Sequence, residues 1–184
     1  MSADTPSFFP VLDDNQLPAS ESDLLAAVKN DFGFVPNLER VLAQAPAALR
    51  AYVALWDLIS ATSLTPVAQQ VVCQQINRQH DCHYCLAHHD VLLKQAGADA
   101  ATRKALLSGE PLPDEALEAL RVFTMTLVAE RGFVSGQAQD AFLSAGYTSA
   151  QMLEIIAILA CKVISNYSNH LAGTPLEPFV RPVT

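Results

Sequence analysis

Residues 65–97 read TPVAQQVVCQQINRQHDCHYCLAHHDVLLKQAG. Thr65 followed by proline is typical of a helix start, because threonine caps free backbone N–H groups and proline fits the first turn. Asp81 is a second candidate N-cap, and Gly97 is a stop signal for the helix that follows it. This stretch therefore predicts two consecutive helices, one starting after Thr65 and one over residues 82–96.

The rest of the chain has the same helical character. Apolar residues recur at helical spacing, and the alternation typical of strands is absent. Cap and stop residues predict further helices over residues 22–30, 37–44, 47–61, 99–107, 114–131 and 135–145, and one capped by Thr148 that extends through Ile164. This last helix is apolar on most sides and belongs in the middle of a bundle. The sequence predicts one all-α, multi-helix bundle domain over residues 1–184, with an extended arm at 173–184 lying on the body or on a neighbour.

Composition limits the class of function. Of 184 residues, 51% are hydrophobic and 16% are charged, which is ample apolar material for one core and excludes a disordered chain. The net charge of −8 provides no basic stripe for nucleic acid and no attraction to an anionic membrane surface.

Targeting signals and cysteine usage indicate the compartment. The longest apolar run, Ile155 to Cys161, has seven residues, well below the ~18 that a membrane span needs. The start of the chain, Met1 to Pro6, shows no signal peptide, so we expect a cytoplasmic protein with no membrane partner. Cysteines stay reduced there unless they bind metal or carry out redox chemistry, which applies to Cys73, Cys82, Cys85 and Cys161.

An internal repeat emerges when the chain is shifted by 84 residues. The shift aligns residues 48–97 with 132–181 without a gap, although identities are few. If the halves are duplicated, each supplies a helical hairpin to a pseudo-symmetric bundle, and neither could bury its apolar face alone. The paired positions include Arg78 with Lys162, Gln70 with Glu154, Cys82 with Asn166 and Cys85 with Asn169. Any cysteine chemistry therefore belongs to the first half.

The segment HDCHYCLAHH at residues 80–89 holds four of the five histidines and two of the four cysteines. Cys82 and Cys85 form a C-x-x-C pair at a predicted helix N-terminus, where free N–H groups favour a thiolate. His89 is four residues after Cys85 and shares its helical face, so its imidazole can take the thiol proton. This arrangement indicates a thiolate that attacks a peroxide or a disulfide, with the second cysteine resolving the sulfenic acid.

A zinc site is the rival interpretation. Cys82 and Cys85 with His88 or His89 could ligate zinc, with His80 or His83 as a fourth ligand. Structural zinc sites usually draw ligands from two separate segments, whereas all these candidates are local. The remaining residues are interpreted more simply: His80, His83 and His88 as surface or packing residues with His88 pointing away from His89, Tyr84 as a packing residue, and Cys73 and Cys161 as core residues.

These motifs resemble the alkylhydroperoxidase D-like / carboxymuconolactone decarboxylase superfamily. The family's redox signature is Glu, eleven residues, then C-x-x-C-x-x-x-H. The resemblance covers residues 20–180 and rests on the run from Leu64 through CHYCLAHH at 82–89 to Gly97, on GFVPNL at 33–38, which is similar to the peroxidase-related subgroup, and on Glu154 and Asn166. It implies an all-α fold with a duplicated helical motif, assembled as trimers or hexamers.

The resemblance also implies site roles. Cys85 matches the peroxide-attacking cysteine, Cys82 the resolving partner and His89 the relay histidine, although helix position alone favours Cys82 as the thiolate. The relay glutamate is replaced by Gln70, whose amide cannot act as a general base. Glu154, its repeat equivalent, is a possible substitute if the two halves meet.

The predicted function is thiol-dependent hydroperoxide reduction through a disulfide/dithiol cycle of Cys82 and Cys85, with electrons from a lipoyl-type dithiol or a thioredoxin-like protein. No nucleotide or flavin motif is visible, so the thiols are the expected redox centre, without cofactor or metal. The alternatives are a zinc-stabilised helical interaction module, a carboxymuconolactone decarboxylase-like enzyme, and a family member in which Gln70 has abolished efficient turnover.

Overall fold

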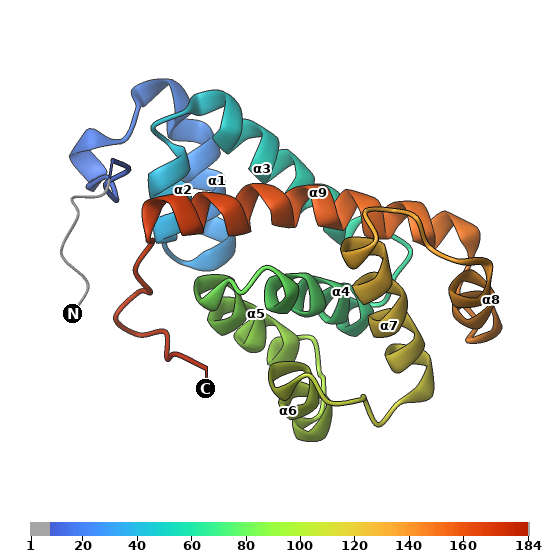
Figure 1. Ribbon diagram of the computed structural model, residues 1–184. Helices are drawn as coiled ribbons and strands as arrows, with labels where there is room; N and C mark the ends of the chain where they lie inside the picture. Colours follow the sequence, from blue (N-terminus) through green and yellow to red (C-terminus); the bar gives the residue numbers. More distant parts are fainter. Residues whose placement is uncertain (1–7, 184) are drawn as a thin grey trace.

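The computed structural model describes residues 8–183, and within them all regular structure is helical (Figure 1). Two short 3₁₀ helices come first and nine α-helices follow. The elements are η1 (Asp14–Gln16), η2 (Ala19–Glu21), α1 (Ser22–Phe32), α2 (Asn37–Leu42), α3 (Pro46–Ser60), α4 (Pro66–Gln79), α5 (His83–Gln95), α6 (Ala100–Ser108), α7 (Glu115–Ala129), α8 (Gly136–Ser144) and α9 (Ser149–Ala172). The predicted all-α fold class is confirmed. The predicted domain also includes residues 1–7 and 184, which lie outside the described residues.

Most helix starts follow from local capping. The side chains of Thr65, Asp99 and Thr148 each accept a hydrogen bond from the backbone N–H three residues later. Such bonds satisfy N–H groups that have no partner inside the helix. α1 differs from the prediction, because Glu21 occupies the N-cap position and Ser22 is the first helical residue.

The turn between α4 and α5 corrects the predicted cap of α5. Cys82, not Asp81, is the N-cap residue of α5. Asp81 instead has a left-handed backbone, with φ of 55°. Its N–H donates to the carbonyl of Arg78, and the N–H of Cys82 donates to that of Asn77. These two bonds form the Schellman ending of α4, which consumes Asp81 and places Cys82 directly at the start of α5.

α9 is the central helix of the bundle. It runs along the molecule above α4 and α5 and packs against α2, α3, α4 and α5 (Figure 1). Its buried apolar residues meet those of α4 in the core, where Cys73 and Cys161 are fully buried, as predicted. By length and composition alone, α9 is long and apolar enough to cross a membrane. The core helix of a soluble protein meets the same criterion. Its buried polar residues, which face α4 and α5, are Lys162, Ser165, Asn166 and Asn169.

The segment after α9 is extended and lies across the N-terminus of α2 and one face of α5. Glu177 holds it there, because its Oε1 accepts hydrogen bonds from the backbone N–H of Asn37, at 2.7 Å, and from the Tyr84 hydroxyl, at 2.8 Å. Phe179 packs edge-on against Phe34, with ring centroids 4.9 Å apart. Residues 174–183 of this segment are called the C-terminal arm below; Thr184 lies outside the described residues. The arm closes one side of the candidate site.

Candidate active site

Cys82 and Cys85 lie one helical turn apart at the start of α5, and both are free thiols. Neither side chain is on an exposed corner of the helix: Cys82 is fully buried and Cys85 is 3% exposed. They are covered because α9 crosses over the N-terminus of α5. Asn169 of α9 points its amide at both sulfurs, with Nδ2 at 3.3 Å from Cys85 Sγ and 3.9 Å from Cys82 Sγ.

The surroundings distinguish the two thiols. Burial by itself would raise the pKa of Cys85, but a hydrogen bond from Cys82, the Lys162 ammonium group and the amides of Asn166 and Asn169 together lower it well below its ordinary value. The same hydrogen bond, together with burial, raises the pKa of Cys82. Cys85 is therefore a thiolate that accepts a hydrogen bond from the Cys82 thiol.

Lys162 is the cation of the site and was not anticipated from the sequence. It is 1% exposed, and its Nζ lies 2.8 Å from His89 Nε2. Burial would lower the pKa of Lys162, but the negative charge of Cys85 outweighs that effect and the net shift is upward. Lys162 therefore stays protonated and balances the thiolate, which leaves neither charge uncompensated in the interior.

His89 occupies the predicted helical face, but it does not bond to a sulfur. Among the hydrogen bonds of residues 8–183, its Nδ1 pairs with Gln70 Oε1 at 2.8 Å and its Nε2 pairs with Lys162. Burial and the nearby charge of Lys162 lower the pKa of His89 well below its usual value. A protonated lysine can only donate, so Nε2 accepts and the imidazole proton lies on Nδ1, directed at Gln70. The predicted His89–Cys85 ion pair is thus replaced by a Gln70–His89–Lys162–Cys85 chain.

Gln70 lies at the site as predicted, but Glu154 does not. The carboxylate of Glu154 accepts hydrogen bonds from the backbone N–H and the hydroxyl of Ser63, at 2.9–3.0 Å, in an exposed part of the surface. Glu154 is at the start of α9, where it caps the loop before α4 and not the redox centre. The suggestion that it substitutes for the missing relay glutamate is therefore wrong.

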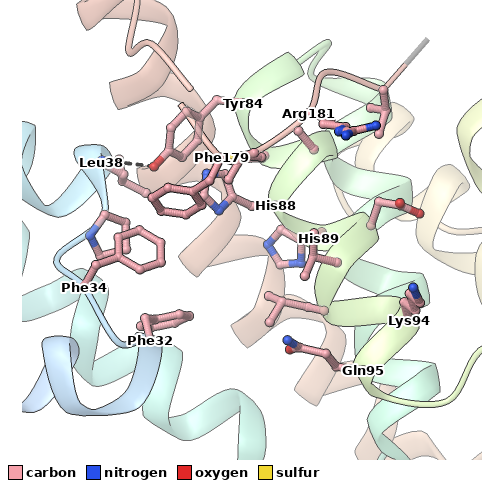
Figure 2. A pocket seen from close by; sticks show the side chains of 18 of the residues that line it. Phe32, Phe34, Leu38, Tyr84, His88, His89, Lys94, Gln95, Phe179 and Arg181 are labelled. Atoms are coloured by element: carbon pink, nitrogen blue, oxygen red, sulfur yellow. Dashed lines mark hydrogen bonds between the residues drawn. The ribbon is translucent and has the colours of Figure 1, made fainter. Parts of the chain in front are cut away.

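A cavity of about 670 Å³ leads to Cys85 and His89. Figure 2 shows Phe32 and Phe34 facing His89 across it, with Phe179 and Arg181 of the arm on a third side. Trp56 completes the aromatic wall, with its ring centroid 5.7 Å from that of His89. Cys82 does not line the cavity, whereas Cys85 and Lys162 do. Of the two cysteines, Cys85 is therefore the one that borders the cavity.

Tyr84 packs in the core as predicted, and both Tyr84 and His88 also line the cavity beside the arm. His88 Nε2 lies 2.7 Å from Glu177 Oε2, and its ring stacks on Tyr84 with centroids 4.4 Å apart. Tyr84 accepts a hydrogen bond from the N–H of Leu38, the bond drawn in Figure 2, and donates one to Glu177. The two residues thereby connect α5 to α2 and to the arm.

The remaining histidines of the segment behave as predicted, His80 as a packing residue bonded to Asn166 Oδ1 at 2.9 Å and His83 as a surface residue beside Asp81. Within residues 8–183, no group of three or more His, Cys, Asp or Glu side chains is arranged to hold a metal ion. The zinc alternative accordingly finds no ligand set in this part of the chain.

Several site residues escaped sequence reasoning, although faint signals existed. Lys162 interrupts the most apolar helix, and its repeat partner Arg78 gave no hint of burial. Asn169, which the 84-residue shift aligns with Cys85, contacts the Cys85 sulfur in the structure. Glu39 lies among apolar residues of α2 and is 4% exposed. A charged residue within an apolar helical face was the detectable signal in both α2 and α9.

Comparison with known proteins was informative only at the level of structure. No family model and no curated protein matches the sequence. An uncharacterized peroxidase-related protein from Ralstonia eutropha JMP134, described as an alkylhydroperoxidase AhpD core, superposes with a TM-score of 0.81, at 22% identity, over 94% of this chain and 93% of its own. The chain has the alkylhydroperoxidase AhpD-core fold. The fold that the sequence resemblance implied is confirmed.

Two further structures share the AhpD-core fold. A peroxidase-related protein from Silicibacter sp. TM1040 superposes with a TM-score of 0.78, at 16% identity, over 95% of this chain and 93% of its own. The debrominase Bmp8, a cysteine-to-alanine variant in complex with 2,3,4-tribromopyrrole, has the same TM-score and identity, over 95% of this chain and 94% of its own. Proteins with this fold thus include a debrominase as well as peroxidase-related proteins.

Proposed function

We propose that the chain belongs to the alkylhydroperoxidase D-like superfamily and reduces organic hydroperoxides through Cys85 and Cys82. The observation that carries the proposal is the Cys85 sulfur at the cavity wall, with its pKa lowered by Cys82, Lys162 and Asn169. The thiolate, not the thiol, is the nucleophile in such chemistry, and activity requires access to it. The site provides both a thiolate and a path to it.

The proposed cycle has two steps. The Cys85 thiolate attacks the terminal oxygen of R–O–O–H, the O–O bond breaks, and Cys85 becomes a sulfenic acid while RO⁻ takes a proton and leaves as an alcohol. The Cys82 thiol then attacks the sulfenic sulfur, so that a disulfide forms and water leaves. The peroxide is reduced by two electrons and the two cysteines are oxidised by two.

Regeneration requires an external dithiol. A lipoyl-type dithiol or a thioredoxin-like protein would reduce the disulfide by thiol–disulfide exchange. A reducing compartment such as the cytoplasm suits this cycle, because the resting thiols must stay reduced. Gln70 holds His89 but cannot accept its proton, so Gln70 positions the imidazole and does not act as a base.

The cavity indicates the class of peroxide. Its aromatic side chains and its volume of about 670 Å³ fit an organic group with apolar surface, since such pockets bury most of a small ligand. Hydrogen peroxide would leave most of this cavity unused. We therefore expect aryl or long alkyl hydroperoxides to be preferred over hydrogen peroxide.

A second candidate is reductive dehalogenation. The aromatic wall around Cys85 is compatible with a flat halogenated ring, and the debrominase Bmp8 shares the fold. The same pair of thiols would supply the two electrons, and bromide release from 2,3,4-tribromopyrrole would reveal the activity.

The deciding experiment measures consumption of cumene hydroperoxide with dihydrolipoamide as the electron donor. The parent protein is compared with Cys85→Ser, Cys82→Ser and, as a control, Cys73→Ala, a buried cysteine of the core. Loss of turnover in the first two variants alone is the expected result. Unchanged turnover in Cys85→Ser, or no turnover in the parent, would contradict the proposed function.

A further inference from the structure

Glu39 carries a carboxyl group that is buried in the interior of the protein. It lies on α2, it is 4% exposed, and its Oε2 is buried without a hydrogen-bond partner. An unpaired carboxylate in the interior carries a large desolvation cost, which a protein avoids by keeping the group protonated. Glu39 thus presents a buried carboxyl oxygen without a hydrogen-bond partner at the wall of the cavity that Cys85 also lines.

The neighbouring elements hold this acid beside the C-x-x-C turn. The backbone N–H of Leu38, the residue before Glu39, bonds to the hydroxyl of Tyr84, the residue before Cys85. Burial, followed by the negative charges of Glu177 and Cys85, raises the pKa of Glu39 to about 8 despite a bond from its own backbone N–H. Glu39 is therefore largely protonated at neutral pH, where the Cys85 thiol is largely ionised.

The peroxide step needs such a group. When the thiolate breaks the O–O bond, RO⁻ is released as a strong base and needs a proton from a group at the cavity. Asn166 and Asn169 are neutral amides, and Cys82 does not line the cavity. The pKa of Lys162 is raised above its ordinary value, so Lys162 holds its proton more tightly than Glu39 does. His89 carries its proton on the nitrogen that faces Gln70, away from Lys162.

We propose that Glu39 is the general acid that protonates the leaving alkoxide. The balance is Cys85–S⁻ + ROOH + Glu39–COOH → Cys85–SOH + ROH + Glu39–COO⁻. In the second step Cys82 attacks the sulfenic sulfur and its proton leaves with the hydroxide as water, while the Glu39 carboxylate regains a proton from solvent, so that the acid is restored. This role rests on the proposed peroxidase function and assigns its missing proton.

The test compares two oxidants of similar size with different leaving groups. Cumene hydroperoxide releases a strongly basic alkoxide, whereas peroxybenzoic acid releases benzoate, which needs no proton. The rate constant for oxidation of Cys85 is measured in single turnover at pH 7 for the parent, Glu39→Gln and the control Glu154→Gln. Since general acids contribute about 10²–10⁴-fold, we expect Glu39→Gln to lose about 100-fold with cumene hydroperoxide and no more than about twofold with peroxybenzoic acid.

Equal losses with both oxidants, or no loss with either, would overturn the role of Glu39 while leaving the peroxidase function intact. Failure of both oxidants to oxidise Cys85 in the parent would instead overturn the proposed function. The control variant is expected to match the parent, because Glu154 caps the Ser63 loop on the surface.

A measurement on the parent protein keeps the proposal testable if Glu39→Gln does not fold. The rate constant with cumene hydroperoxide should fall as the pH rises above about 8, where Glu39 ionises, while alkylation of Cys85 by iodoacetamide, which needs only the thiolate, should not fall. A peroxide rate that holds constant above this pH would contradict the proposal. The other titratable groups facing Glu39 from the packed elements are Tyr52 of α3, Tyr84 and Cys85 of α5, Cys161 and Lys162 of α9, and Glu177 of the arm.

Discussion

Lys162 joins two groups that the C-x-x-C-x-x-x-H spacing suggested were in direct contact. Its ammonium group bonds to His89, and its charge lowers the pKa of Cys85. A single residue from α9 thus determines how the helical face of α5 works. The His89 imidazole contacts Lys162, and among the hydrogen bonds of residues 8–183 none joins it to a sulfur.

Replacing Lys162 tests this arrangement. Lys162→Met keeps the length of the side chain and removes the charge, so the pKa of Cys85 should rise. Once that pKa exceeds 7, each further unit lowers the fraction of thiolate at pH 7 by about tenfold. We expect iodoacetamide alkylation at pH 7 to slow by about tenfold or more. His89→Ala should slow it less, and Lys104→Met, an exposed lysine of α6, should leave it unchanged. Equal alkylation rates in the parent and Lys162→Met would remove the lysine from the mechanism.

Gln70 stands where a carboxylate would complete the family's relay. Gln70→Glu places a carboxylate against the Nδ1–H of His89, which favours the imidazolium form and provides a proton acceptor within 2.8 Å. Peroxide turnover should rise by about 100-fold, at the low end of the 10²–10⁴-fold that a general base contributes. A decrease in steady-state turnover with an unchanged circular dichroism spectrum would mean that the relay does not pass through this position.

Glu39 also makes the stability of the fold depend on pH. Burial raises its pKa from 4.5 to about 8 in the folded state, so the folded protein binds this proton more tightly than the unfolded chain does. The stability that comes from the tighter binding of the Glu39 proton is fully present below about pH 4.5. It is lost as the pH rises from there to about 8.

Urea unfolding at pH 5 and pH 8 checks this dependence. The free energy of unfolding of Glu39→Gln, relative to the parent, should increase between the two pH values by at most about 4 kcal/mol. Glu130→Gln, an exposed glutamate at the end of α7, is the matched control and should show no such increase. A constant difference between parent and Glu39→Gln would show that the carboxyl group is not held protonated.

At the scale of elements, the C-terminal arm is fixed mainly through one residue. Glu177 accepts from Asn37 and Tyr84 and lies 2.7 Å from His88, which connects the arm to α2 and α5. Burial would raise the pKa of Glu177, but the bond to His88 and the other bonds lower it, so the group stays ionised.

Glu177→Gln tests the attachment of the arm. The substitution keeps the side-chain shape but removes the charge. Hydrogen bonds to charged groups contribute about 1.5–3 kcal/mol each, so the arm should be held less tightly. Amide hydrogen exchange in residues 174–183 should therefore accelerate. The preference for cumene hydroperoxide over hydrogen peroxide should fall as well, because Phe179 leaves the cavity wall. Unaltered exchange in the arm, with Glu130→Gln as the reference, would show that other contacts hold it.

At the scale of the whole molecule, the exposed face of α9 bears on assembly. Leu153, Ile156 and Leu171 are 69%, 47% and 73% exposed on this central helix. Large exposed apolar residues of this kind often mark an interface. We expect a homo-oligomer, a trimer or hexamer, and light scattering should give that mass for the parent. Leu153→Glu should shift the mass toward the monomer, whereas a monomeric parent would contradict the expectation.

Local chemistry explains how much of the molecule could be predicted from its sequence. Caps such as Thr65 and Asp99 act within four residues, so helix starts could be identified without knowledge of the fold. The same spacing logic placed His89 on the correct face of α5. Asp81 misled because a good capping residue is also one of the few that tolerates a left-handed backbone.

The rest of the site depends on contacts between distant segments. Lys162 is 73 residues from His89, and Glu177 is 93 residues from Tyr84, so no local pattern could reveal either pair. The helical spacing indicated which side chains share a face of α5, but not which element covers that face. Packing of α9 over α5 decided both the burial of the thiols and which sulfur becomes the thiolate.

The groups of α9 that lower the pKa of Cys85 belong to the last helix to be synthesised. Asn169 follows Cys85 by 84 residues. Cys85 is therefore synthesised well before Lys162 and Asn169, the groups of α9 that lower its pKa. Until then the nascent thiol has the ordinary pKa of about 8.5 and stays mostly protonated at cellular pH. The low pKa of Cys85 therefore depends on docking of the last helix to be made.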